Sequence, residues 1–329
     1  KFLSGKFNSQ VREELANLAL QFNQPLAIRS SSRLEDSLHQ PFAGVYRTYF
    51  LANDHPDEEI RVKQLINSIK LVYASTYSEN AKSFIRATQH SIEEESMAIV
   101  IQPLIGKKHK NRFYPTLAGV ARSFNFYPVG PMEPNEGIAA AALGLGKTVA
   151  NGEKCVRFSP FRPKRVYQFA NVDSTLKSAQ RQFWALKMEE SPEMPTINPE
   201  FNLLKLDLNS AEEDGEISDI ASTWDSQNDR IWDGIGRSGV RLITLNGYLK
   251  RNSFPLCEIL QQILKKCEEM LDCPVEIEFA LIDNDDVKQF HLLQLRPLVS
   301  ESTEVEIDFD EKMLESALAH SNVSLGNGV

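Results

Sequence analysis

The chain has 329 residues, of which 42% are hydrophobic and 25% charged, and 36 Lys and Arg stand against 45 Asp and Glu, a net charge of −9. This composition excludes a disordered, collagen-like or disulfide-scaffold protein, because it supplies ample core and only four Cys. The apolar runs are shorter than the ~18 residues that cross a bilayer. An acidic chain without a basic block also argues against a nucleic-acid partner. We expect a cytoplasmic, globular protein of about two domains.

The first part of the chain alternates helical and strand patterns. Apolar residues at helical spacing follow Ser9, and Pro56 with the acids behind it is typical of the first turn of a helix. The segment 138–145 is too rich in Gly and Ala to assign. The expected elements are helices over residues 9–22, from 56 onward and over 79–89, and strands over 26–28, 45–51, 98–104 and 117–124.

The second part is less regular, and Pro160 and Pro163 mark a break within it. A turn-rich loop at 283–286 separates two strand patterns and predicts a hairpin. The expected elements here are a strand over 165–169, helices over 174–188, 210–223, 255–271 and 311–319, a loop over 191–198, and hairpin strands over 275–282 and 288–295.

Four polar residues are expected on one face of this last hairpin. If the strands pair symmetrically about Asp286, Glu276 lies opposite Arg296 and Glu278 opposite Gln294. The other face is expected to be apolar, with Ile277, Phe279, Leu281, Leu293 and Leu295. Carboxylate and amide oxygens are the ligands that magnesium takes beside substrate phosphates, and a guanidinium can hold a phosphate oxygen. The alternative is a solvated sheet face with a cross-strand Glu–Arg pair.

Two further segments are candidates for phosphate binding. Arg29-Ser30-Ser31-Ser32 follows a buried strand and offers a forked guanidinium, hydroxyls and backbone N–H groups. It is equally compatible with an ordinary polar loop. Gly144-Leu145-Gly146-Lys147-Thr148 ends like a P-loop, but that motif needs Gly at position 141, where this chain has Ala141. We therefore reject the P-loop interpretation.

Several short motifs occur together in a recognisable order. They are Leu26-Ala27-Ile28-Arg29-Ser30-Ser31, Glu35-Asp36, Phe42-Ala43-Gly44 with Tyr46 and Thr48, Gly144-Leu145-Gly146, Glu276-Ile277-Glu278 and Leu293-Gln294-Leu295-Arg296-Pro297. In this combination the chain resembles the N-terminal ATP-binding domain of the phosphoenolpyruvate synthase / pyruvate phosphate dikinase family. The resemblance implies an α+β, ATP-grasp-like fold, with mixed or antiparallel sheets in two lobes and a nucleotide cleft between them.

The resemblance also implies a function and a set of site residues. ATP would donate its β-phosphoryl group to a His on a swivelling domain. A pyruvate-binding domain of the same parent chain would then pass the phosphoryl group to pyruvate. Arg29 and Arg296 would contact phosphates as the catalytic residues, and Glu278 and Gln294 would hold Mg²⁺. Glu276 would hold the ribose or support the metal. The adenine-side segment would contribute Ile101, Gln102 and Leu104.

The same resemblance divides the chain. Residues 1–104 would form the first lobe, with a helical hairpin at about 56–90. Residues 105–300 would form the second lobe, with an inserted segment at about 170–235, and 301–329 an acidic linker towards the swivelling domain. The family's upstream Gly-Gly-Lys segment and its Thr-Ser-His acceptor motif are absent, so we expect a fragment that is incomplete for catalysis.

Three positions depart from the family pattern. Glu276 replaces an Asp, Lys147 replaces the usual Glu, and Ala121-Arg122-Ser123 follows Gly119-Val120 where the family has Phe-Thr. These departures leave two alternatives open: a catalytically silent regulatory or binding module of the same fold, and a dikinase-type kinase with another acceptor, such as a glucan or an antibiotic.

Overall fold

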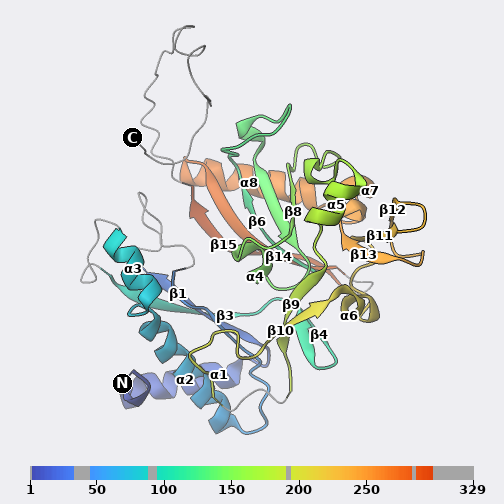
Figure 1. Cartoon of the computed structure of the whole chain (residues 1–329). Coiled ribbons are helices and arrows are strands. Elements are labelled where there is room, and N and C mark those ends of the chain that lie inside the picture. Colours follow the sequence, from blue (N-terminus) through green and yellow to red (C-terminus); the bar gives the residue numbers. More distant parts are fainter. Residues whose placement is uncertain (1, 33–44, 88–94, 190–193, 284–286, 299–329) are drawn as a thin grey trace.

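The computed structural model describes residues 2–32, 45–87, 95–189, 194–283 and 287–298. Helices and antiparallel sheets are interspersed along this part of the chain (Figure 1), which confirms the predicted α+β class. None of its helices has the length and apolar character needed to span a membrane. The expected linker 301–329 with its helix at 311–319, and the motifs Glu35-Asp36 and Phe42-Ala43-Gly44, lie outside the described residues.

The first part of the chain builds a three-stranded antiparallel sheet in the order β2-β1-β3, covered by helices. The side chain of Asn8 accepts a hydrogen bond from Val11 N and caps α1, while Asp57 caps α2 in the same way. Leu26, Ile28 and Tyr49 are fully buried against these helices. The elements are η1 (Phe2–Ser4), α1 (Ser9–Gln21), β1 (Leu26–Ser32), β2 (Tyr49–Leu51), α2 (Glu58–Ser75), α3 (Glu79–Ala87) and β3 (Met97–Pro103).

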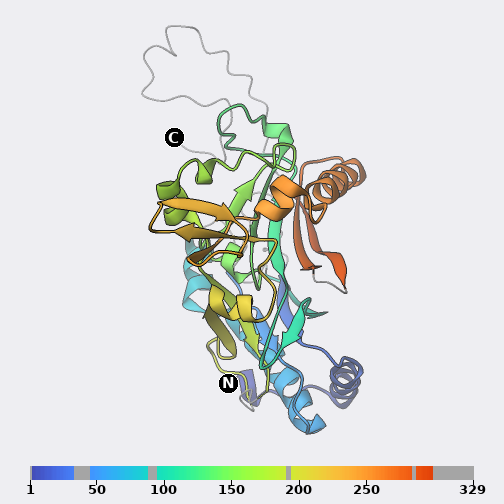
Figure 2. The ribbon, with the colours of Figure 1, turned by 90° about the vertical axis from the view of Figure 1, so that its right-hand side faces the viewer.

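A second, larger core surrounds a five-stranded antiparallel sheet in the order β15-β14-β6-β7-β8. Helix α8 contacts β14 and β6, and Figure 2 shows the β14–β15 hairpin beside this helix. Gly119 allows close packing here, since a Cβ would lie 2.5 Å from Ala140 O. The elements are β6 (Leu117–Arg122), β7 (Ile138–Ala142), β8 (Val156–Phe158), α8 (Leu256–Leu271), β14 (Val275–Asp283) and β15 (Lys288–Pro297).

Two smaller antiparallel sheets complete the described chain, in the orders β10-β9-β5-β4 and β12-β11-β13. Their strands are β4 (Lys107–His109), β5 (Arg112–Tyr114), β9 (Gln182–Lys187), β10 (Leu203–Asp207), β11 (Ala221–Asp225), β12 (Arg230–Asp233) and β13 (Val240–Ile243). The remaining helices are η3 (Pro134–Glu136), α4 (Lys147–Ala150), η4 (Tyr167–Phe169), α5 (Val172–Ser178), α6 (Leu208–Glu213) and α7 (Asn246–Arg251).

The predicted hairpin register is confirmed at the end that carries the polar residues. Glu276 pairs with Arg296 and Glu278 with Gln294, but a β-bulge then shifts the register, so that Phe279 pairs with Leu292. The expectation that Leu293 belongs to the apolar core face is therefore wrong. Phe290 takes a core position instead, stacked on Phe279 with ring centroids 5.3 Å apart.

Three other element predictions are wrong, each for an identifiable reason. Residues 174–188 form α5 and then strand β9, because the strand pairs with β10 and β5 and alternately buries Phe183 and Ala185. Residues 210–223 contain the end of α6 and the start of β11, because Gly215 adopts a left-handed φ of 79° after the helix. Residues 165–169 contain the 3₁₀ helix η4, which brings Val166 and Phe169 onto the core.

A buried polar network centres on Asp214 at the end of α6. Its carboxylate accepts hydrogen bonds of 2.7 and 2.8 Å from Arg112 and one of 2.6 Å from the Tyr114 hydroxyl. Burial by itself raises the pKa of Asp214, but the hydrogen bonds from Arg112 and Tyr114 outweigh it and hold the pKa below its ordinary value. The charged carboxylate therefore stabilises the fold at neutral pH.

We predict that Asp214→Asn lowers the free energy of unfolding at pH 7 by about 3 kcal/mol, because it leaves the Arg112 charge buried without a counter-charge. The pKa of Asp214 is depressed in the folded state. The difference in unfolding free energy between the two proteins is therefore fully present above about pH 4, and it shrinks as the pH falls through the pKa of the folded state. Urea unfolding at several pH values measures it. Asp272→Asn, at an exposed left-handed helix end, is the matched control. A pH-independent difference would contradict the electrostatic origin.

Candidate functional site

The polar face of β14 lies at the centre of a row of charged residues. Glu276 is the register partner of Arg122 on β6 and of Arg296 on β15, so one carboxylate lies between two arginines. Arg122 Nε lies 2.6 Å from Glu276 Oε2. Two residues further along β14, Glu278 stands opposite Gln294. Strand alternation places Glu276 and Glu278 on the same face.

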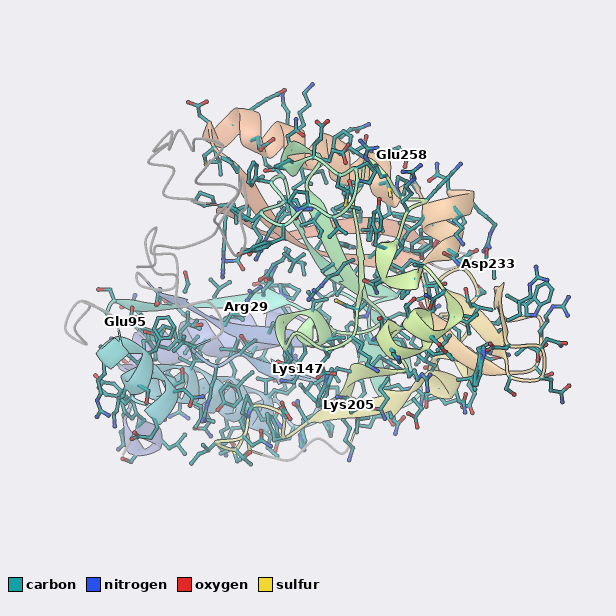
Figure 3. All side chains as sticks on the ribbon, turned by 45° about the horizontal axis from the view of Figure 1, so that its top comes forward. Arg29, Glu95, Lys147, Lys205, Asp233 and Glu258 are labelled. Atoms are coloured by element: carbon teal, nitrogen blue, oxygen red, sulfur yellow. The ribbon has the colours of Figure 1, made fainter. Side chains whose placement is uncertain are left out.

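Arg29 reaches this face from a different sheet. It lies on β1, and its Nη2 atom donates a 2.8 Å hydrogen bond to Gln294 Oε1 and lies 2.9 Å from Glu278 Oε2. Figure 3 shows Arg29 on the blue strands, where they approach the orange hairpin. The Arg29 and Glu278 side chains are 23% and 29% exposed. Such a part-exposed pair contributes only about 1 kcal/mol or less to stability.

A pocket of about 120 Å³ opens beside this contact. Both sheets contribute to it, since its walls come from β1, β3 and β15. The lining residues are Arg29, Ser30, Ser31, Val100, Gln102, Leu293, Gln294 and Arg296. A pocket walled by two arginines, two serine hydroxyls and two amides is suited to an anionic ligand with many hydrogen-bond acceptors.

The expected adenine-side residues divide into two groups. Gln102 lines the pocket and donates a 3.4 Å hydrogen bond to Leu293 O. Ile101 packs against the core of the first sheet, and Leu104 packs against a separate cluster that includes Leu145. The structure thus brings Gln102 together with Arg29, whereas the side chains of Ile101 and Leu104 are committed to packing.

Lys147 is engaged outside the pocket. Its Nζ lies 2.7 Å from Glu200 and 5.3 Å from the centre of the Trp184 ring. The preceding turn requires glycine at Gly144, where φ is 84° and a Cβ would lie 2.6 Å from Trp184 O. Lys147 is therefore held by a local ion pair and a cation–π contact.

Among the described residues around this pocket, Arg29, Arg122 and Arg296 stand with two carboxylates, Glu276 and Glu278, in a chain of net charge −9. Within the described ranges, no group of three or more His, Cys, Asp or Glu side chains is placed to hold a metal ion. Glu278 and Gln294 offer one carboxylate and one amide oxygen, and magnesium is usually held by one or two protein carboxylates while phosphates and water complete its shell.

Sequence reasoning missed Arg122 as a member of this site. The residue was visible only as part of a departure from a family motif, at Ala121-Arg122-Ser123. Its place beside Glu276 depends on the pairing of β6 with β14, which are 154 positions apart at the Arg122–Glu276 contact. No local periodicity encodes such a pairing.

Comparison with known proteins shows the family to which the chain belongs. The family model described as "Pyruvate phosphate dikinase, AMP/ATP-binding domain" matches residues 1–316, and the chain belongs to this family. The resemblance predicted from the sequence is thereby confirmed. A curated relative is the "Uncharacterized phosphotransferase YvkC" of Bacillus subtilis (strain 168), 24% identical over 316 residues. The match covers 95% of this chain and 28% of the relative, so the chain spans less than a third of that protein's length.

Proposed function

We propose that the chain binds ATP with Mg²⁺ in an ATP-grasp cleft between two lobes, residues 1–104 and 105–300, as the nucleotide-binding part of a phosphotransferase. The observation that carries the proposal is the contact of Arg29 on one sheet with Glu278 and Gln294 on another, beside a polar pocket. Membership of an AMP/ATP-binding domain family supports it.

The residues of the pocket divide by chemistry into phosphate and metal ligands. Arg29 and Arg296 would bind phosphate oxygens, because a guanidinium offers paired N–H donors. Glu278 and Gln294 would hold magnesium, which would neutralise phosphate charge during transfer. Arg29 lies within 3 Å of both Glu278 and Gln294. When ATP and Mg²⁺ bind, the metal ion would therefore take the place of the Arg29 guanidinium at Glu278.

Glu276 would bind the ribose. Glu276 has an arginine as its register partner on each neighbouring strand. These positive charges weaken the attraction of the Glu276 carboxylate for a metal cation, but the carboxylate can still accept hydrogen bonds from hydroxyl groups. Gln102 would contact the base with its side chain. Ile101 in β3 and Leu104, which directly follows β3, would contribute backbone groups and packing rather than side-chain contacts.

The reaction proposed transfers the β-phosphoryl group of ATP to a His on a swivelling domain. The bond between the α- and β-phosphates breaks and AMP leaves, and hydrolysis releases the γ-phosphate as inorganic phosphate. Pyruvate on a further domain is the final acceptor. Support comes from the family, which is named for pyruvate phosphate dikinase, and from the relative, whose name describes a phosphotransferase. Such a reaction needs charge neutralisation and positioning more than a covalent group on this domain. The pocket offers Arg29 and Arg296 for the first purpose.

We predict that isothermal titration detects ATP binding that is stronger with Mg²⁺ than with EDTA. Arg296→Gln weakens it by about tenfold or more, because a charge-assisted hydrogen bond to phosphate is lost. Glu278→Gln abolishes the difference between the affinity for ATP measured with Mg²⁺ and that measured with EDTA. Arg251→Gln is the matched control, because Arg251 forms an exposed pair 3.6 Å from Asp219. If the unmodified chain gives no nucleotide response, or if Glu278→Gln keeps the full metal dependence, the proposal is wrong.

A catalytically silent module of the same fold is the second candidate, favoured by the engagement of Lys147 with Glu200. The full-length gene product, incubated with ATP and Mg²⁺, distinguishes the two. We predict that mass spectrometry finds phosphohistidine together with AMP, the products of β-phosphoryl transfer. Nucleotide binding without either product would leave the silent module as the function.

A further inference from the structure

Two arginines and a tryptophan form a cluster on the small sheet β12-β11-β13, away from the candidate site. The Cζ atom of Arg230 lies 4.0 Å from the centre of the Trp232 ring, and that of Arg237 lies 4.1 Å from it. Figure 1 shows this sheet at the edge of the molecule, and in Figure 3 Asp233, which follows Trp232 on β12, is well separated from Arg29. We call Arg230, Trp232 and Arg237 the arginine–tryptophan cluster.

The two arginines of the cluster are exposed and have no ion-pair partner among the residues that the structure describes. Arg241 on β13, by contrast, is paired with Glu212 at 2.6 Å. The pKa of Asp225 is held below its ordinary value mainly by a hydrogen bond from Asn228, and the charge of Arg237 adds the least to this shift. Because both guanidiniums lie against one ring, their like charges are close together and repel each other. An anion bound beside them would relieve this repulsion.

The contacts of the cluster also fix the directions in which it can donate hydrogen bonds. A guanidinium that packs on an aromatic ring keeps its N–H donors free in its own plane, where they match the two oxygens of a carboxylate. The loop that carries Arg237 is tied to β13, because Arg237 O accepts a 2.6 Å hydrogen bond from Arg241 Nη1. The cluster is therefore prepared to bind more than one carboxylate.

The cluster lies along a strand edge that can accept another strand. β12 ends the order β12-β11-β13, so among the described strands only β11 pairs with it. Arg230 and Trp232 are two positions apart on β12 and point to the same face. A peptide strand that adds to this edge would place every second side chain beside them.

We propose that β12 and the arginine–tryptophan cluster form a docking edge for an extended acidic segment of a partner protein. The segment adds to the sheet as a strand, and its carboxylates, at alternate positions, bind Arg230 and Arg237. The proposal is independent of nucleotide binding.

An acidic peptide fits this surface better than a nucleic acid does. Strand alternation places Asp233 on the opposite face of β12 from Arg230 and Trp232. A peptide strand can carry its carboxylates on the arginine face alone and uncharged side chains on the face of Asp233. The phosphates of a nucleic acid strand cannot alternate in this way, and the basic residues of the cluster are too few to hold a run of them.

The test titrates a capped synthetic peptide of about eight residues, in which Glu and Thr alternate, into the unmodified chain at low salt. We expect Arg230→Gln and Arg237→Gln each to weaken binding by about tenfold, because each removes a charge-assisted hydrogen bond. Arg251→Gln is the matched control and leaves the affinity nearly unchanged, because Arg251, 46% exposed at the end of α7, is paired with Asp219 instead. A peptide with Gln in place of Glu binds at least about tenfold more weakly.

Two further probes test the mode of binding without changing the protein. N-methylation of alternate peptide bonds keeps every carboxylate but removes N–H donors that an added strand needs, and we expect it to abolish binding. A single-stranded oligothymidylate is expected to bind more weakly than the peptide.

Four results would overturn the inference. They are an unmodified chain that does not bind the peptide, an N-methylated peptide that binds as tightly as its parent, an oligothymidylate that binds more tightly than the peptide, and an Arg251→Gln variant that loses as much affinity as Arg230→Gln. Titration with ATP is a separate measurement, so the proposed function does not depend on any of them.

Discussion

The contact of Arg29 with Glu278 and Gln294 joins two sheets that share no strand. One sheet is formed by β1, β2 and β3, the other by the strands around β14, and each has its own hydrophobic core. The Arg29 guanidinium crosses from the first sheet to the second at 2.8 and 2.9 Å. Its partners are oxygens of the kind that magnesium binds. The same contact therefore places a guanidinium, a group suited to phosphate, beside two oxygens of the kind proposed here to hold a metal ion.

The rest of the fold holds these groups in place. Burial of Ile277, Phe279 and Leu281 against the main core fixes which face of β14 is polar. The β-bulge after Glu278 alters the register only beyond the polar residues, and it exposes Leu293 to the pocket. The buried network around Asp214 stabilises this part of the chain separately from the site. The buried network and the proposed binding site thus use different charged groups.

Much of the geometry of the candidate site could be predicted from the sequence, because its key feature is local. Glu276, Glu278, Gln294 and Arg296 come from one hairpin, where alternation and a turn define the face and the register. Arg29 was found through its motif. Arg122 was not assigned, since its place depends on the pairing of distant strands. The helix predicted over residues 174–188 failed for a similar reason, because β9 is a strand only through its partners β5 and β10.

The central claim is that nucleotide and metal replace the Arg29 contact at Glu278 and Gln294. A crystal structure of the chain with Mg²⁺ and a non-hydrolysable ATP analogue tests this most directly. We expect the metal bound by Glu278 and Gln294, and Arg29 moved from Glu278 to a phosphate oxygen. The account would be contradicted by an analogue bound elsewhere, or by an Arg29–Glu278 contact that stays intact beside the bound nucleotide.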